Sequence, residues 1–139
     1  MHPSVFPHLD DDGCEVTGPP DDRYNCLAWA VGDTGRWWWP HDGRYWPEGV
    51  PRDETLDAIL AALESVGFRA VPAPDPTGEC VAVYAKAGVP THMAKRLPDG
   101  RWSSKLGGNV HVTHATPHGV EGPLYGDVVR YLSRPVPTA

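Results

Sequence analysis

The stretch DDRYNCLAWAVGDTGRWWWP, residues 21–40, sets one cysteine among large aromatic side chains. An aspartate at its start can cap a helix over residues 25–31, and Gly32 is suited to end that helix. Cys26 then lies at the start of the helix, where backbone N–H groups stabilise a thiolate. Two interpretations are open: Cys26 is a nucleophile, or it is a small apolar residue of the core, because cysteine is often buried.

The chain on both sides of this stretch predicts one domain of the α+β class over residues 1–139. Residues 1–20 are polar and contain proline and glycine, so we expect an irregular lead-in before a core of residues 21–134. A second helix is predicted over residues 53–66, where leucine, isoleucine and valine recur at helical spacing and Gly67 follows.

Beyond Gly67 the pattern changes to short apolar runs broken by proline and glycine, which is typical of strands. We expect the Cys26 helix to pack on a small, mainly antiparallel sheet of roughly three to five strands. The sequence PDG at residues 98–100 predicts a tight hairpin turn. The candidate strands are residues 68–72, 80–86, 91–97, 101–106 and 110–114, and residues 123–135 close the domain as a helix or an irregular extended segment.

Composition and charge limit the classes of partner. The formal net charge of −6 argues against nucleic acid, because phosphate binding needs a concentrated positive patch. The three cysteines form no CxxC pair and no disulfide framework. There is no basic segment followed by an apolar run, as in a signal peptide, and no stretch reaches the roughly 20 apolar residues of a membrane helix. We therefore expect a protein of the reducing cytoplasm, without membrane association and without a cofactor.

His92 is the candidate base for a Cys26 nucleophile. A cysteine nucleophile needs a histidine within hydrogen-bonding distance and a third polar group that orients this histidine. His92 opens a predicted strand directly after the turn AGVP, so its ring is held at the end of the sheet beside a hairpin partner. His114 is an alternative base or orienting group. Asn25 and the adjacent amides can donate hydrogen bonds to an oxyanion.

The run HVTHATPH, residues 111–118, also raises the question of a metal site, because imidazole is a common metal ligand. On a strand, however, His111 and His114 point to opposite faces, which prevents a joint site. No paired carboxylate or cysteine motif accompanies them. We therefore expect no metal.

Two segments, YNCLAWA and GVPTHMAKRLPDGRW, resemble the papain-like fold, and the minimal NlpC-type cysteine hydrolases in particular. The resemblance covers roughly residues 24–105, and the chain is also similar to small uncharacterised bacterial domains near this group. It implies that Cys26 is the nucleophile, His92 the base and Ser104 the third residue, although the family usually has His, Asn, Asp, Glu or Gln in that third position. The function implied is a cysteine-dependent hydrolase or acyltransferase (peptidase, amidase or deamidase) that forms a thioester with a peptide or protein substrate.

The aromatic loop that follows the Cys26 helix, residues 35–46, has two interpretations. Its rings can pack on the domain, since aromatic side chains bury large areas. They can also form a wall of the substrate groove, in which case Trp38 and Trp46 bind substrate. Because the loop follows the helix by only a few residues, we expect it to border the same cleft as Cys26.

The rival function is a non-catalytic binding module that uses the aromatic loop to hold a peptide or a protein partner. One structural criterion separates the two functions. A Cys26 that is buried, or that lies beyond hydrogen-bonding distance of every histidine, favours the binding module. A Cys26 thiol next to His92 or His114 favours catalysis.

Overall fold

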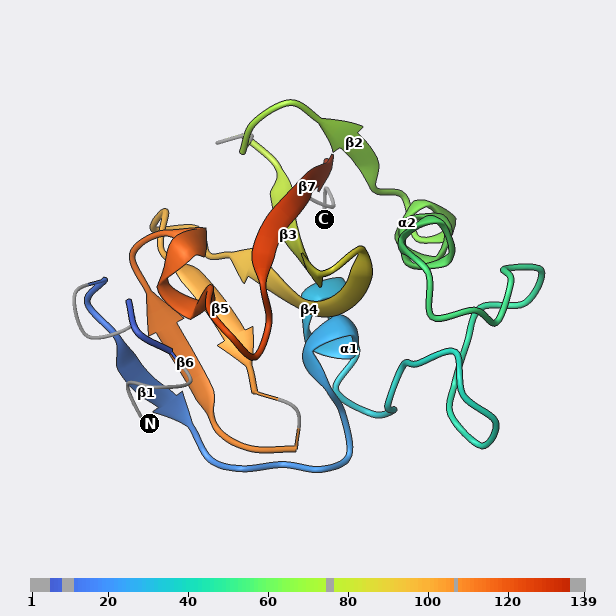
Figure 1. Ribbon diagram of the computed structural model, residues 1–139, viewed down its shortest axis with the longest axis horizontal. Coiled ribbons are helices and arrows are strands. Elements are labelled where there is room, and N and C mark those ends of the chain that lie inside the picture. Colours follow the sequence, from blue (N-terminus) through green and yellow to red (C-terminus); the bar gives the residue numbers. More distant parts are fainter. Residues whose placement is uncertain (1–5, 9–11, 75–76, 107, 136–139) are drawn as a thin grey trace.

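The computed structural model describes residues 6–8, 12–74, 77–106 and 108–135 (Figure 1). These residues form a seven-stranded antiparallel sheet with the order β1-β6-β5-β4-β3-β7-β2. The strands are β1 (Glu15–Gly18), β2 (Arg69–Val71), β3 (Glu79–Lys86), β4 (Val89–Arg96), β5 (Trp102–Lys105), β6 (His111–His114) and β7 (Asp127–Arg134). The helices in the described ranges are α1 (Cys26–Val31), α2 (Leu56–Ser65) and the 3₁₀ helix η1 (Pro117–Val120).

The predicted α+β class, with a papain-like core and a smaller sheet, is wrong. The sheet is larger than expected, and only two short α-helices accompany it in the described chain. β1 forms inside the predicted lead-in, where it pairs with β6. β7 forms in the segment for which a helix or an irregular extension was predicted. It pairs with β3 over Glu79–Ala85 and with β2 on its other edge, so tertiary pairing decides its conformation.

The helix α1 begins and ends close to the predicted residues because its signals are local. Asn25 is the N-cap, and its Oδ1 accepts a hydrogen bond from the backbone N–H of Ala28. Gly32 ends the helix in the left-handed region at φ 87°. A helix of six residues is too short to be stable alone, so its buried face depends on contact with the sheet, chiefly with β4.

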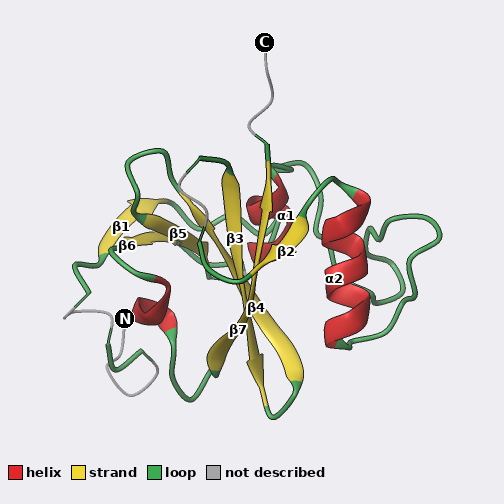
Figure 2. Ribbon diagram, turned by 90° about the horizontal axis from the view of Figure 1, so that it is seen from above, coloured by secondary structure: helices red, strands yellow, loops and turns green. Residues whose placement is uncertain are grey.

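The helix α2 lies within the predicted range, with Thr55 as its N-cap. It buries Ala58, Ile59, Ala62 and Leu63. With α1 and the aromatic loop it forms the helix-side core, which Val83 and Met93 complete from the sheet. The α2 helix and η1 lie on opposite sides of the central strands (Figure 2).

The second core lies on the η1 side of the sheet. It includes Ala82 and Tyr84 of β3, which alternate along the strand with the helix-side Val81 and Val83. The same alternation applies to β4, β5 and β6, where Ala94, Trp102 and Val112 belong to the second core. Residues two positions away from these, His92, Ser104 and His114, therefore have their side chains on the η1 side.

Two irregularities of β4 lie near His92. The register with β3 shifts between Tyr84 and Ala85, which leaves Thr91 as an extra residue in β4 directly before His92. Such bulges bend a strand and are common next to functional sites. In addition, the ladder between β4 and β5 covers only Lys95 and Arg96, so it does not extend to His92.

Candidate functional site

Cys26 is the first residue of α1 and borders a cavity of about 380 Å³. The cavity is lined by Asn25, Cys26, Trp37, Trp39, His41, Arg44, Thr91 and Tyr125. The start of α1 and the aromatic loop thus share one cavity, which confirms the prediction that this loop borders the same cleft as Cys26. We call it the Cys26 cavity.

The Cys26 thiol is protonated at neutral pH. Only 6% of the residue is exposed, and this burial raises the pKa of the thiol to about 11. The backbone N–H groups of Met93, Leu27 and Cys26 itself favour the thiolate but only partly offset the burial. The expectation that the helix start lowers the pKa is therefore not met, because desolvation outweighs the nearby N–H groups.

Three buried side chains form a chain of hydrogen bonds across β4, β5 and β6. His92 Nε2 lies 2.9 Å from Ser104 Oγ, and Ser104 Oγ lies 2.9 Å from His114 Nε2. His114 Nδ1 lies 2.6 Å from the carbonyl oxygen of Thr116. All three side chains are fully shielded from solvent. We call them the histidine relay.

The position of each proton in the histidine relay can be deduced from the end at the Thr116 carbonyl. A carbonyl oxygen only accepts, so His114 Nδ1 carries a proton and donates it to Thr116. Burial lowers the pKa of His114, so its ring is neutral and its Nε2 accepts a hydrogen bond from the Ser104 hydroxyl. Ser104 Oγ in turn accepts from His92 Nε2, which therefore carries the proton of that ring.

His92 Nδ1 carries no proton, and its lone pair accepts no hydrogen bond from the described residues. Burial, with a smaller contribution from His114, holds the pKa of His92 well below its ordinary value of 6.5, so the ring carries one proton only. In the described part of the chain, His92 Nδ1 is also the single buried side-chain nitrogen or oxygen without a hydrogen-bond partner. Leaving such an atom unsatisfied costs about 1–3 kcal/mol, so it calls for an explanation.

Tyr125 connects His92 to the Cys26 cavity. Its ring stacks on the His92 ring with centroids 4.1 Å apart and planes 2° from parallel. Tyr125 also lines the cavity, and its carbonyl oxygen accepts a hydrogen bond from the hydroxyl of Thr91. The ring therefore covers one face of the imidazole and forms part of the wall beside the thiol.

In the described chain no hydrogen bond joins Cys26, which belongs to the helix-side core, to His92, whose side chain lies on the η1 side of the sheet. The sulfur interacts with the backbone N–H of Met93, the residue that follows His92. Within the described ranges, no hydrogen bond joins the thiol to a histidine, and His92 Nδ1 has no partner. By the criterion given above, the burial of Cys26 and this missing hydrogen bond both count in favour of the binding module.

Three of the other predicted site residues have structural contacts. Asn25 Oδ1 accepts from the backbone of Ala28 and Trp38, and its Nδ2 donates to the Trp38 carbonyl, so its side chain ties the start of α1 to the aromatic loop. Trp38 and Trp46 are buried in the helix-side core. Trp37 and Trp39 line the cavity in their place. The alternative base, His114, has both nitrogens engaged and acts on His92 only through Ser104.

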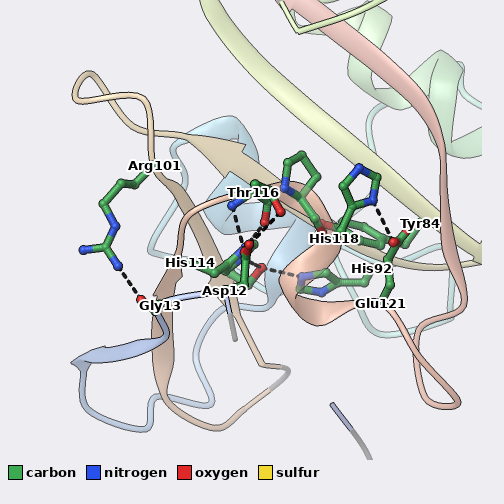
Figure 3. Close-up of polar contacts among 11 residues, drawn as sticks. Asp12, Gly13, Tyr84, His92, Arg101, His114, Thr116, His118 and Glu121 are labelled. Carbon is green, nitrogen blue, oxygen red and sulfur yellow. Dashed lines mark hydrogen bonds and ion pairs between the residues drawn. The ribbon is translucent and has the colours of Figure 1, made fainter. Parts of the chain in front are cut away.

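The far end of the relay is held by Asp12. Its carboxylate accepts hydrogen bonds from the backbone N–H and the hydroxyl of Thr116 (Figure 3). Asp12 thereby fixes the carbonyl that orients His114. Neither Asp12 nor Thr116 was predicted as a site residue. Asp12 stands in an acidic run of the lead-in, and no local sequence pattern pairs it with Thr116, which lies 104 residues further along the chain.

The two remaining histidines of residues 111–118 lie apart from the relay. His111 Nε2 is bonded to the Tyr24 hydroxyl at 2.6 Å, and His118 Nδ1 is bonded to Glu121 at 2.7 Å. Among the residues with described positions, no three His, Cys, Asp or Glu side chains come together in a way that could hold a metal ion.

Comparison with known proteins gives a family without an assigned activity. Residues 15–133 match the family described as a domain of unknown function, DUF7689, and the chain belongs to this family. No curated protein and no solved structure is significantly similar to it. In the described chain, no helix has the length and apolar character needed to cross a membrane.

Proposed function

We propose that the protein is a thiol-dependent hydrolase or acyltransferase, with Cys26 as the nucleophile and His92 as the general base. The observation that carries this proposal is the bare lone pair of His92 Nδ1, kept buried and unpaired by the relay beside the backbone segment that contacts the Cys26 sulfur. A core that served only stability would gain by satisfying this atom. A base must have a free lone pair before reaction, and the relay provides one.

The reaction proceeds through a thioester. The Cys26 sulfur attacks the carbonyl carbon of an amide, ester or thioester, and the thiol proton moves to His92 Nδ1. His92 then donates this proton to the leaving amine, alcohol or thiol as its bond to the carbonyl carbon breaks. Water, or an acceptor amine or alcohol, gives a proton to His92 Nδ1 and attacks the thioester. The acyl product leaves, and the thiol regains the proton.

The resting pair is neutral, which distinguishes this proposal from a preformed thiolate–imidazolium pair. The raised pKa of Cys26 and the lowered pKa of His92 both disfavour the charged forms. Proton transfer therefore accompanies substrate entry, when the thiol closes onto Nδ1, as catalytic hydrogen bonds often tighten only in the complex. The backbone N–H groups of Met93 and Leu27, which face the sulfur, are candidate donors to the anionic tetrahedral intermediate.

The second candidate is the non-catalytic binding module. It is favoured by the buried Cys26 and by the missing hydrogen bond between the thiol and any histidine in the described residues. In this function the aromatic walls Trp37 and Trp39 hold a peptide or a protein partner, and the histidine relay only ties three strands together.

We also infer that the protein works in the reducing cytoplasm. Cys14, Cys26 and Cys80 form no disulfide with one another, and a thiol nucleophile persists where glutathione keeps cysteines reduced. The substrate class we infer is a peptide or a protein, because amide bonds are the common target of thiol nucleophiles with this arrangement.

Acylation by p-nitrophenyl acetate tests the proposed function. Incubation of the native protein at pH 7 should add one acetyl group, located on Cys26 by mass spectrometry and removed by hydroxylamine. The Cys26→Ser variant should show no such adduct. An unmodified Cys26, or acetylation spread over exposed lysines only, would contradict catalysis and leave the binding module.

A further inference from the structure

Arg44 is the charged residue of the Cys26 cavity that lacks an ionic partner. It lies in the aromatic loop and lines the cavity. Its guanidinium carbon lies 4.9 Å from the centre of the Trp37 ring, which is another wall of the same cavity. In the described chain, Arg44 forms no ion pair, whereas Arg36 in the same loop is paired with Asp33 at 3.0 Å.

The one carboxylate held against the cavity wall is already engaged. Glu54 accepts a hydrogen bond from Trp39 Nε1 at 2.7 Å and is paired with His41 Nε2. Trp39 and His41 are thereby fixed as wall residues, and Glu54 is not bound to Arg44. The walls of the cavity therefore contain the Cys26 thiol, aromatic rings and the Arg44 guanidinium, whose N–H groups donate no hydrogen bond to another described residue.

We propose that the Cys26 cavity binds an acyl substrate that carries a carboxylate beside the reacting carbonyl, and that Arg44 recognises this carboxylate. A guanidinium stacked on an indole keeps its N–H edge free, and this edge matches a carboxylate with two parallel hydrogen bonds. One guanidinium balances the single negative charge of a carboxylate, whereas a phosphate group carries about two negative charges. The inference rests on the proposed thiol chemistry of Cys26 and specifies its substrate class.

Two alkylating reagents of nearly equal size test the proposal. Iodoacetate and iodoacetamide both form a carbon–sulfur bond at the thiol and release iodide, while the thiol proton passes to the base or to solvent. They differ in charge, so the ratio of their rates at Cys26, divided by the same ratio for free cysteine, reports the charge preference of the cavity. The rates are measured at pH 7 and low salt by mass spectrometry of the Cys26 peptide.

Arg44→Gln should lower this normalised ratio about fivefold, the effect of removing one unit charge about 4 Å from another in water. The matched control is Arg36→Gln, which makes the same change of net charge in the same loop but outside the Cys26 cavity. It should leave the ratio unchanged. Added salt should reduce the ratio of the wild type toward that of Arg44→Gln.

Short peptides identify the source of the carboxylate. Acetyl-Gly-Asp-Gly-amide offers a side-chain carboxylate, acetyl-Gly-Asn-Gly offers a terminal one, and acetyl-Gly-Asn-Gly-amide offers none. Protection of Cys26 from iodoacetamide by one charged peptide supports the proposal and assigns the source, provided that Arg44→Gln abolishes the protection. Equal protection by the uncharged peptide, or none by either charged peptide, overturns it.

The outcomes separate this inference from the proposed function. If Cys26 is alkylated but the ratio is the same in wild type and Arg44→Gln, or falls equally in Arg36→Gln, recognition by Arg44 is wrong and thiol chemistry stands. If neither reagent alkylates Cys26 in the native protein, the proposed function fails, and the substrate class fails with it.

Discussion

Two cavities of similar volume each have a buried cysteine in their walls. The Cys26 cavity measures about 380 Å³, and a second cavity of about 430 Å³ is bordered by Cys80 at the start of β3. The Cys80 cavity is rich in charge, and its carboxylate, Glu79, is engaged by Arg134. Arg134 is paired with Glu79 and also donates to the carbonyl oxygens of Val66 and Val31.

The difference shows that a cavity and a thiol do not by themselves indicate chemistry. In the Cys80 cavity, Arg134 is held by three acceptors, which are the Glu79 carboxylate and two backbone carbonyl oxygens, so it joins β7 to the ends of both helices. Beside the Cys26 cavity, His92 Nδ1 has no hydrogen-bond partner and Arg44 has no carboxylate partner among the described residues. Unused polar atoms, rather than volume, distinguish the candidate site from a structural cavity.

Removal of the base, His92, should give the largest change in the reactivity of Cys26 relative to Cys80. In His92→Gln, the amide keeps an N–H donor for Ser104 but lacks the basic nitrogen. Alkylation of Cys26 by iodoacetamide at pH 7 should slow by about 1000-fold, within the range of about 100- to 10,000-fold for general-base catalysis. Cys80, measured in the same mass spectra, should keep its rate. Equal rates for Cys26 in the two proteins would rule out His92 as the base.

The raised pKa of Cys26 predicts the next largest effect, on stability at alkaline pH. Burial raises this pKa from its ordinary value of 9.0 to about 11, so the folded state favours the protonated thiol. The resulting stabilisation is complete below about pH 9 and is lost as the pH rises from 9 to 11. Relative to Cys26→Ala, the wild type should lose about 3 kcal/mol of unfolding free energy across this window.

Urea denaturation of both proteins at pH 8, 9, 10 and 11 measures this difference. Parallel curves for wild type and Cys26→Ala would show that the thiol is not desolvated in the folded state, and would remove the distinction between a neutral resting pair and a preformed thiolate.

Ser104 gives a smaller effect, because it acts on Cys26 through His92. In Ser104→Ala, the two imidazole Nε2 atoms lose their shared partner, and the His92 ring is no longer held in one tautomer. Alkylation of Cys26 should slow by about tenfold, less than for loss of the base itself. Its dependence on pH should also change, which a loss of packing alone would not produce.

Ser103 provides the matched control on the same strand. Its hydroxyl accepts from Trp29 Nε1 at 3.0 Å on the α1 side of the sheet, away from the relay. Ser103→Ala should lower stability by about 1 kcal/mol and leave alkylation of Cys26 unchanged. If the two variants slow Cys26 equally, Ser104 contributes general stability rather than the orientation of His92.

The parts of the fold that depend on local signals could be predicted from the sequence. Gly32 and the apolar residues before it specify α1 within a few neighbouring residues, although the N-cap is Asn25 and not the predicted Asp21 or Asp22. The runs that became β3 and β4 have the same local character, with turns on either side. The β7 strand could not be predicted, because its partners β3 and β2 are more than forty residues away along the chain in the register Glu79↔Arg134 and Arg69↔Ser133.

The candidate site divides in the same way. Cys26, His92 and Ser104 could be selected because each residue type suits a stated chemical role at a predicted element end. The pKa shifts of these residues could not be predicted from the sequence. The burial that raises the pKa of Cys26 and lowers that of His92 depends on Tyr125 and on the packing of both cores. Trp38 and Trp37 are neighbours of the same type, and only the loop conformation decides which of them lines the cavity.

Lys95, in the Cys80 cavity, gives the smallest expected effect and completes the comparison. Its ammonium lies 3.6 Å from the centre of the Trp29 ring, and burial lowers its pKa, so desolvation offsets much of the cation–π attraction. Lys95→Met keeps the length of the side chain and removes the charge. We expect unfolding free energy to change by less than about 1 kcal/mol and alkylation of Cys26 at pH 7 to stay within about twofold of the wild type. A tenfold change at Cys26 would show that the two cavities are coupled through α1, and the distinction between a functional and a structural cavity would no longer hold.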